Sequence, residues 1–325
     1  MGEFERLAAA AALAVALMTA AGAAAAEEAR LRAVTGFQPG TRFSAQFEKF
    51  VDKVNEDGKG VVQIQLVGGP GAVPPMEQGN AVRTGVVDIA NVPGAYYVNL
   101  VPEADALKLA TRPMAEQREN GGWELVNRIH NERMNVQYLA RTGTGIPFHF
   151  FFREPVDNGF DFDGLRVRVT PVTRDVVAAL GGVPVTTAPG EVFTAMERGV
   201  VDGYGWPVQG IFDLGWQEVT GARLDPGFYS VEVNILVNLD AWNRLDDDQR
   251  RVLQEAALWV EGLDAGNAEE NEAEKKRQAE AGIQTITVPA QEAEAFAEKA
   301  REIGWNAVIE RSPEHGPRLR ELLDR

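Results

Sequence analysis

Apolar residues recur along the chain with two different periods. Phe43, Phe47 and Phe50 fall at the 3.6-residue spacing of one helix face. Apolar runs at 31–35 and 61–67 precede and follow this helix and predict strands. Strands that alternate with helices favour an α/β sheet, in which ligands bind at the carboxyl ends of the strands.

A weak internal repeat indicates two such units. Residues 81–88 and 195–202 each end in the same four residues, Gly-Val-Val-Asp. In each copy we expect a helix to end at the glycine, a short strand to contain the valines, and a loop to follow the aspartate. Two related lobes with facing loops would enclose a cleft. The alternative is coincidence, because this is also a common helix-to-strand sequence.

A long polar segment connects the two halves. Residues 246–281 contain no proline, and their early apolar positions keep helical spacing. A helix of this length, roughly 50 Å, exceeds the width of one domain. It should therefore run along both lobes unless Gly262 and Gly266 divide it. The predicted lobes are lobe I, with residues 27–150 and 231–262, and lobe II, with residues 151–230 and 263–325; the helix at about 246–281 spans both.

Residues 1–26 have the pattern of a secretory signal peptide. An uncharged apolar run at 7–18 is followed by small residues up to Ala26 and then by Glu27. The run is too short to span a bilayer, so we expect cleavage near Ala26 and a periplasmic protein. Acidic residues before the run depart from the usual positive flank, and an uncleaved buried helix is the alternative.

The composition argues against several classes of function. Thirty-two Lys and Arg against 48 Asp and Glu give a net charge of −16, which disfavours a nucleic-acid or anionic-membrane footprint. The absence of cysteine removes disulfides and thiolate chemistry, and the three histidines lie far apart in the sequence. No nucleophile or phosphate-binding motif is complete. Binding is therefore favoured over catalysis; the alternative is an exported hydrolase or lyase that uses Asp88, Asp202 or Glu191.

The segment 164–169 supplies a candidate anion-binding group. As a strand it places Leu165, Val167 and Val169 on one face and two arginines on the other. An arginine near the end of a strand can bind a carboxylate with two parallel hydrogen bonds. The other interpretation is that both arginines are solvated residues of an edge strand.

Several ordered segments resemble the solute-binding proteins of tripartite ATP-independent periplasmic (TRAP) transporters. They are residues 164–169, 179–185, 191–203 and 241–245. The resemblance implies an extracytoplasmic receptor with the two-lobed periplasmic-binding-protein fold, a hinge and a long connecting helix. Such a receptor captures an organic acid without a cofactor and passes it to membrane permease subunits driven by a sodium gradient.

The resemblance also implies roles for single residues. The carboxylate-binding arginine of the family falls on Arg168, which leaves Arg166 as a surface residue. Trp206 stands where binders of acidic sugars usually carry asparagine, and Gly205 where metal-dependent binders of 2-oxo acids carry glutamate. A second arginine of some acidic-sugar binders would fall near Phe148. These departures predict no bound metal and put an acidic sugar in doubt.

The expected cleft wall is mainly aromatic. It favours a monocarboxylate with an aromatic or apolar body, although stacking on a sugar ring uses the same side chains and leaves a sugar acid open. Phe150 and Phe152 are expected in the core of a strand. A sensor input with the same fold is a further alternative. The predicted ligand-binding residues are Arg168, Trp206, Tyr96, Phe37, Gln38, Phe148, His149, Tyr204 and Asn234.

Overall fold

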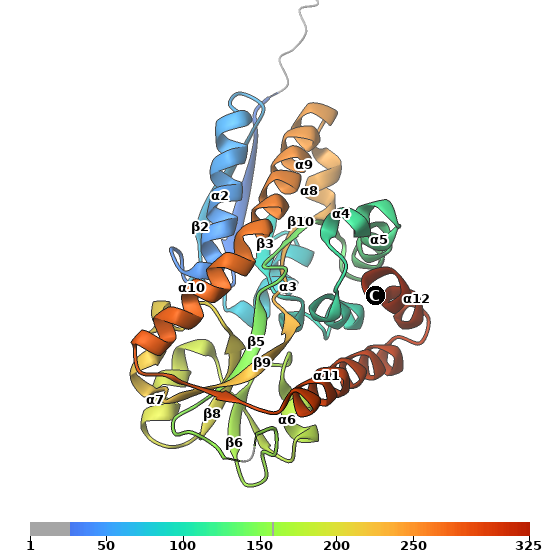
Figure 1. The fold of residues 1–325 in the computed structure, drawn as a ribbon. Helices are drawn as coiled ribbons and strands as arrows, with labels where there is room; N and C mark the ends of the chain where they lie inside the picture. Colours follow the sequence, from blue (N-terminus) through green and yellow to red (C-terminus); the bar gives the residue numbers. More distant parts are fainter. Residues whose placement is uncertain (1–26, 158) are drawn as a thin grey trace, which may run out of the picture.

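The computed structural model describes residues 27–157 and 159–325, which form two lobes (Figure 1). Lobe I contains a five-stranded sheet in the order β2-β1-β3-β10-β4, and lobe II a six-stranded sheet in the order β11-β9-β5-β8-β6-β7. The predicted two-lobed α/β fold is confirmed, whereas the predicted signal peptide lies outside the described residues. The strands of lobe I are β1 (Ala29–Thr35), β2 (Val62–Gly68), β3 (Ile89–Val92), β4 (Val136–Thr142) and β10 (Val233–Asn238); those of lobe II are β5 (Pro147–Phe152), β6 (Arg166–Val169), β7 (Val183–Thr186), β8 (Gly203–Pro207), β9 (Ala222–Ser230) and β11 (Gln284–Thr287).

Helices cover both faces of the sheet in lobe I. On one face lie α2 (Arg42–Asp57) and α9 (Asp247–Gly262), with Phe47 and Phe50 of α2 buried as the apolar spacing predicts. Among residues 27–157 and 159–325, every helix lacks the length or the apolar composition that a membrane span requires. The other helices of six or more residues in the described chain are α3 (Gln78–Arg83), the 3-10 helix η3 (Pro102–Leu109), α4 (Met114–Glu119), α5 (Gly122–Met134), α6 (Arg174–Ala179), α7 (Val192–Glu197), α8 (Leu239–Arg244), α10 (Asn267–Glu280), α11 (Ala290–Arg311) and α12 (Gly316–Leu323).

The two Gly-Val-Val-Asp segments share one local structure, but it is not the predicted one. After α3 and α7 the chain turns at Gly85 and Gly199, whose φ angles are 74° and 65°. In each copy the first valine is exposed and the second is buried. The valines belong to the turn, and the strand begins only after the aspartate, at Ile89 in β3 and Gly203 in β8. The segments predicted as loops are therefore strands.

Hydrogen bonds of the two aspartates explain this shift. The backbone N–H of Asp88 donates to the carbonyl of Arg32 at 2.9 Å, and its carboxylate accepts the N–H of Arg32 at 2.8 Å. Asp202 makes the same pair of bonds with Arg166, at 2.8 and 2.9 Å. Each aspartate thus fastens the turn to a neighbouring strand and determines where the parallel pairing begins.

Three short segments join the lobes, and we call them the hinge region: residues 143–146 between β4 and β5, residues 231–232 between β9 and β10, and the 3-10 turn η7 (Leu263–Gly266) between α9 and α10. Asp264 of η7 ties two of them together. Its carboxylate accepts the backbone N–H groups of Gly143 at 3.0 Å and Thr144 at 2.9 Å. The predicted connecting helix is therefore two helices separated by a 3-10 turn.

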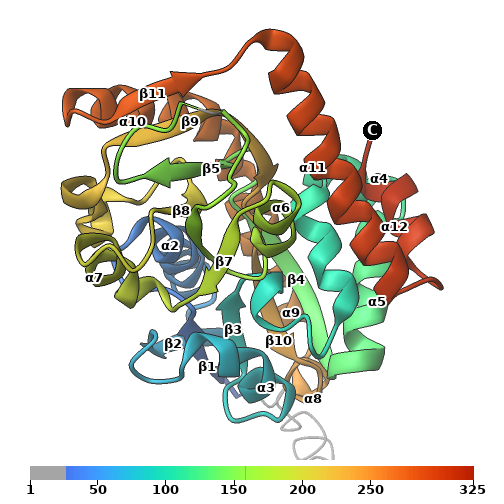
Figure 2. The ribbon, with the colours of Figure 1, turned by 90° about the horizontal axis from the view of Figure 1, so that it is seen from below.

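The C-terminal helices return from lobe II to lobe I. Figure 2 shows α11 leading away from β11 and α12 lying beside α5. Leu319 and Leu323 of α12 belong to the buried core of lobe I, and Asp324 accepts the indole N–H of Trp305 at 2.8 Å. Residues after α11 thus pack on lobe I, whereas 263–325 were assigned to lobe II. Likewise β5 begins in lobe II at Pro147, before the expected boundary at 150.

Gly143 in the hinge region has no room for a side chain. Its φ is +90°, and an added Cβ would lie 2.5 Å from Cγ1 of Val231. We expect Gly143→Ala to lower the free energy of unfolding by about 3 kcal/mol, from overpacking together with backbone strain. Gly145→Ala is the control, because Gly145 has a φ of +85° but open space around it. It should cost only about 1 kcal/mol. Urea unfolding measures both, and equal losses would contradict the predicted clash.

Candidate functional site

A cavity lies between the lobes at the carboxyl ends of four strands, where the sheet pattern places a ligand. From lobe I, β1 and β3 lead into its wall; from lobe II, β6 and β8 do so. The lobes touch here, since the rings of Phe43 and Trp206 meet edge to face with centroids 6.1 Å apart. The aromatic residues that line the cavity are Phe37, Phe43, Tyr96, Phe148 and Trp206.

Arg168 lies beside Trp206, behind the lobe II residues that line this cavity. Val167 and Val169 face the core of lobe II, so alternation along β6 turns Arg168 to the opposite face. Its residue is 0% exposed. Nε and Nη2 donate to the carbonyl of Thr187 at 3.2 and 2.8 Å, and the guanidinium carbon lies 5.7 Å from the centre of the Trp206 ring.

Arg166 precedes it on the same face of the strand but has a different environment. Its side chain is 45% exposed and pairs with the carboxylate of Asp202 at 2.7 Å. The expectation that Arg166 is a surface residue is confirmed. The two arginines differ because β6 runs from the surface into the interior. Arg166 lies at its exposed start, and Arg168 lies near its buried end.

Two buried donors, one on Trp206 in this wall and one on Arg168 beside it, lack an acceptor within the described part of the chain. Nη1 of Arg168 is buried without a hydrogen-bond partner, and so is Nε1 of Trp206. Both groups can only donate, so only an acceptor from outside the described residues would satisfy them. A buried charged donor without a partner costs roughly 1–3 kcal/mol or more. A carboxylate has the charge and the lone pairs to satisfy both nitrogens.

Charges of both signs act on the cavity. Burial lowers the pKa of Arg168 to about 10, while Tyr96, Glu191 and Tyr204 oppose the decrease. The guanidinium therefore stays protonated at neutral pH. Burial also raises the pKa of Tyr96, an effect that Arg168 reduces and Glu232 increases. Tyr96 thus lies within the field of a positive group and of an acidic group.

The structure brings five of the predicted site residues to this cavity. Phe37, Tyr96, Phe148 and Trp206 line it, and Arg168 lies directly beside the indole of Trp206. They come from both lobes and from five separate segments of the chain. Their convergence depends on the meeting of the two sheets rather than on any one local motif.

The other four predicted residues lie elsewhere. Gln38 is exposed and does not line the cavity. His149 follows a lining residue in β5 and so points to the opposite face, where Nδ1 lies 3.0 Å from a backbone carbonyl. Tyr204 is buried in lobe II, and its hydroxyl lies 2.7 Å from a threonine hydroxyl. Asn234 is buried in lobe I among hydrogen-bond partners of its own.

Glu232 and Phe43 line the cavity although sequence reasoning did not select them. Glu232 stands in the hinge region between Val231 and Val233, and a carboxylate inside an apolar run was the available signal. Phe43 was assigned to the buried face of a helix. It lies in the first turn of α2, where that face reaches the edge of the cleft.

Two α/β lobes, a hinge region of three segments and a cavity between the lobes are the features of a bilobal binding protein. The chain belongs to the bacterial extracellular solute-binding proteins of family 7, whose family model matches residues 36–310. The resemblance to TRAP solute-binding proteins is thereby confirmed, and similar solved structures are TRAP solute-binding proteins as well.

Individual relatives agree with this assignment. A monocarboxylate 2-oxoacid-binding periplasmic protein from a Nostoc species is 28% identical over 201 residues, which cover 57% of this chain and 53% of that protein. The matched part thus spans about half of this curated relative. The TRAP protein of Desulfovibrio salexigens with bound orotic acid has a TM-score of 0.79 at 20% identity, covering 91% of this chain and 97% of that one. The TRAP protein of Roseobacter denitrificans with bound L-galactonate has a TM-score of 0.74 at 21% identity, covering 91% and 99%.

Glu232 makes the stability of the folded chain depend on pH. Burial raises the pKa of its carboxyl to about 7 from an ordinary value of 4.5, although the N–H of Gly94, the amide of Asn234 and the charge of Arg141 lower it. Between these two pH values the folded state binds more protons than the unfolded state. This contribution to the free energy of unfolding therefore falls as the pH rises from about 4.5 to 7.

Glu232→Gln should remove this dependence. As the pH rises from about 4.5 to about 7, the free energy of unfolding of the natural chain should fall by up to about 3 kcal/mol relative to that of the variant. Urea unfolding at a series of pH values measures the difference, and Glu314→Gln at an exposed carboxylate serves as the control. A difference that stays constant with pH would show that the Glu232 carboxyl titrates normally.

Proposed function

We propose that this chain is the extracytoplasmic receptor of a TRAP transporter and binds a small monocarboxylic acid with an aromatic or apolar body. The acid lies between the lobes with its carboxylate on Arg168, and the closed receptor delivers it to the membrane permease. The observation that carries the proposal is the pair of buried donors without acceptors, Nη1 of Arg168 and Nε1 of Trp206, at the wall of an aromatic cavity.

Ligand binding and closure are coupled in this proposal. With the lobes in contact, the Arg168 guanidinium is removed from water and only partly satisfied. A buried charge without its partner is costly, and supplying the partner recovers several kcal/mol. The ligand therefore has a higher affinity for the closed form, which is the condition for it to shift the equilibrium toward closure.

A sugar acid is the second candidate ligand. The relative from Roseobacter denitrificans has bound L-galactonate, and aromatic side chains also stack on sugar rings. Against it, Trp206 occupies the position where acidic-sugar binders usually carry asparagine. The bound orotic acid of the Desulfovibrio salexigens protein is a planar acid and favours the first candidate.

The positions of Asp88, Asp202 and Glu191, the candidate acid–base residues, disfavour an enzymatic role. The carboxylates of Asp88 and Asp202 accept backbone N–H groups of neighbouring strands. Glu191 accepts the backbone N–H of Ala188 at 3.1 Å, which buttresses the turn before α7. All three have local structural partners, so we assign them no acid–base role.

Arg168→Met tests the proposed carboxylate site. We expect acid binding to weaken by at least about a hundredfold, because the change removes the charged donor. The unfolding free energy without ligand should be unchanged or higher, because a buried charge is replaced by an apolar side chain of similar length. Isothermal titration calorimetry and urea unfolding measure the two effects. Arg166→Met is the control, and unchanged affinity in Arg168→Met would refute the proposal.

Trp206→Asn separates the two candidate ligand classes. The substitution removes a flat ring and an indole donor from the wall but supplies the amide that acidic-sugar binders usually carry. We expect it to reduce affinity for aromatic monocarboxylates about tenfold more than affinity for sugar acids, because burial of the ring face is lost. Competitive titrations of both classes measure the ratio. An equal loss for both would count against an aromatic ligand.

A further inference from the structure

Glu232 lies where the two lobes join. It occupies the connection between β9 of lobe II and β10 of lobe I, and it lines the cavity between Val231 and Val233. The residue is only 5% exposed. Both oxygens of its carboxylate accept the backbone N–H of Gly94, at 2.9 and 2.8 Å. A carboxyl group is thus held in an otherwise apolar part of the wall.

A chain of hydrogen bonds in lobe I shows that the side chain of Asn234 donates to the carboxyl group of Glu232. Nδ1 of His130 lies 2.7 Å from the carbonyl of Val126, so Nδ1 carries the proton and Nε2 is an acceptor. The hydroxyl of Tyr97, 3.2 Å from Nε2, must then donate to it. Its oxygen accepts one hydrogen of the Asn234 amide at 3.0 Å, and the other amide hydrogen donates to Oε2 of Glu232 at 2.6 Å.

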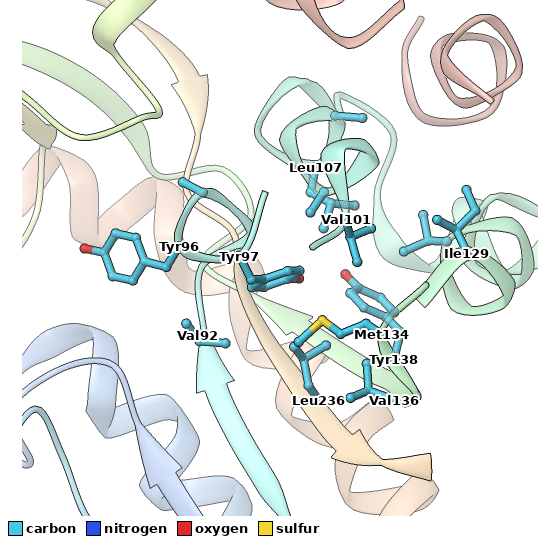
Figure 3. Close-up of a cluster of buried hydrophobic side chains, with 14 of the residues drawn as sticks. Val92, Tyr96, Tyr97, Val101, Leu107, Ile129, Met134, Val136, Tyr138 and Leu236 are labelled. Carbon is cyan, nitrogen blue, oxygen red and sulfur yellow. The ribbon is translucent and has the colours of Figure 1, made fainter. Parts of the chain in front are cut away.

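The carbonyl of the Asn234 amide is held as well. Tyr138 donates its hydroxyl to Oδ1 at 3.1 Å. Figure 3 shows Tyr97 and Tyr138 turned into the core of lobe I, while Tyr96 points in the opposite direction. In the ionised carboxylate both oxygens of Glu232 are therefore acceptors. Oε2 accepts two N–H groups, whereas Oε1 accepts only the shared backbone N–H and retains capacity for another donor.

Above about pH 7, where Glu232 is ionised, the cavity has a positive group beside it, Arg168, and a negative group in its wall, Glu232. Arg168 belongs to lobe II, Glu232 belongs to the hinge region, and Tyr96 feels the charge of both. Arg141 acts on Glu232 from β4 but does not line the cavity. The titratable and charged groups that act on Glu232 are Tyr96 and Tyr97 from the segment after β3, Asp105 from η3, and Tyr138 and Arg141 from β4.

We infer that Glu232 selects ligands by a hydrogen-bond donor. The acid that Arg168 holds carries an O–H or N–H group at the end remote from its carboxylate, and this group donates to Glu232. Dicarboxylates are rejected, because a second carboxylate beside Glu232 would place two like charges in a space shielded from water. The inference rests on the proposed function and narrows its ligand class.

Calorimetry on the purified chain at about pH 9, where Glu232 is ionised despite its raised pKa, tests this with acids that differ only at the remote end. One series contains linear acids of increasing length whose last carbon carries hydrogen, hydroxyl, methoxy or carboxylate; the other contains benzoates with the same groups at the meta or para position. Hydroxy acids should bind about tenfold or more tightly than their methoxy counterparts, which cannot donate. The dicarboxylates should bind most weakly in each series.

Glu232→Gln should remove this preference for hydroxy acids. The N–H groups of Gly94 and Asn234 point at the side chain, so the amide oxygen is needed to accept them and the amide NH2 faces the cavity. Methoxy acids and dicarboxylates should then gain about tenfold relative to hydroxy acids. Glu261→Gln is the matched control, because Glu261 is a buried lobe I carboxylate that pairs with Arg118 and does not line the cavity. It should leave the order unchanged.

The outcomes separate this inference from the proposed function. Equal binding of hydroxy and methoxy acids by the natural chain, or tightest binding of a dicarboxylate, overturns the role of Glu232 and leaves the receptor with its Arg168 site. Failure of every acid to bind in an Arg168-dependent manner overturns the proposed function and this inference together. If Glu232→Gln does not fold, the series on the natural chain decides alone.

Discussion

The burial of one incompletely satisfied guanidinium is the constraint on which the site depends. Arg168 is removed from water where the lobes meet, and Nη1 faces no acceptor from the described protein. In the proposed function this arrangement opposes closure without a ligand and favours it with a carboxylate in place. The charge that makes the empty closed form costly would then provide the energy that holds the bound acid.

The fold serves this interaction by bringing strand ends of two sheets together. β6 delivers Arg168 from lobe II, while β1 and β3 deliver aromatic side chains from lobe I. Hydrogen bonds between the lobes hold them in contact. The backbone N–H of Arg42 in α2 donates to the Asp213 carboxylate of lobe II at 2.6 Å, and the guanidinium of Arg42 donates to Asn267 of α10 at 2.8 Å. The hinge region adds Glu232 at the point where the chain itself passes between the lobes.

Local periodicity predicts local structure well here, and little beyond it. The spacing of α2 and the alternation of 164–169 correctly place buried residues, because each depends only on the geometry of one element. The choice of Arg168 over Arg166 came from family resemblance, since alternation treats both alike. The strand starts were displaced by the bonds of Asp88 and Asp202, which involve distant partners. Glu232 was missed because its role requires the meeting of both lobes.

The most direct test of the central claim is a crystal structure of the protein with a bound acid, obtained from co-purified ligand or by co-crystallisation. The account predicts closed lobes with the carboxylate of the acid within hydrogen-bonding distance of both Nη1 of Arg168 and Nε1 of Trp206. An acid bound with its carboxylate elsewhere, or closed lobes in which Arg168 pairs with a protein carboxylate, would contradict it.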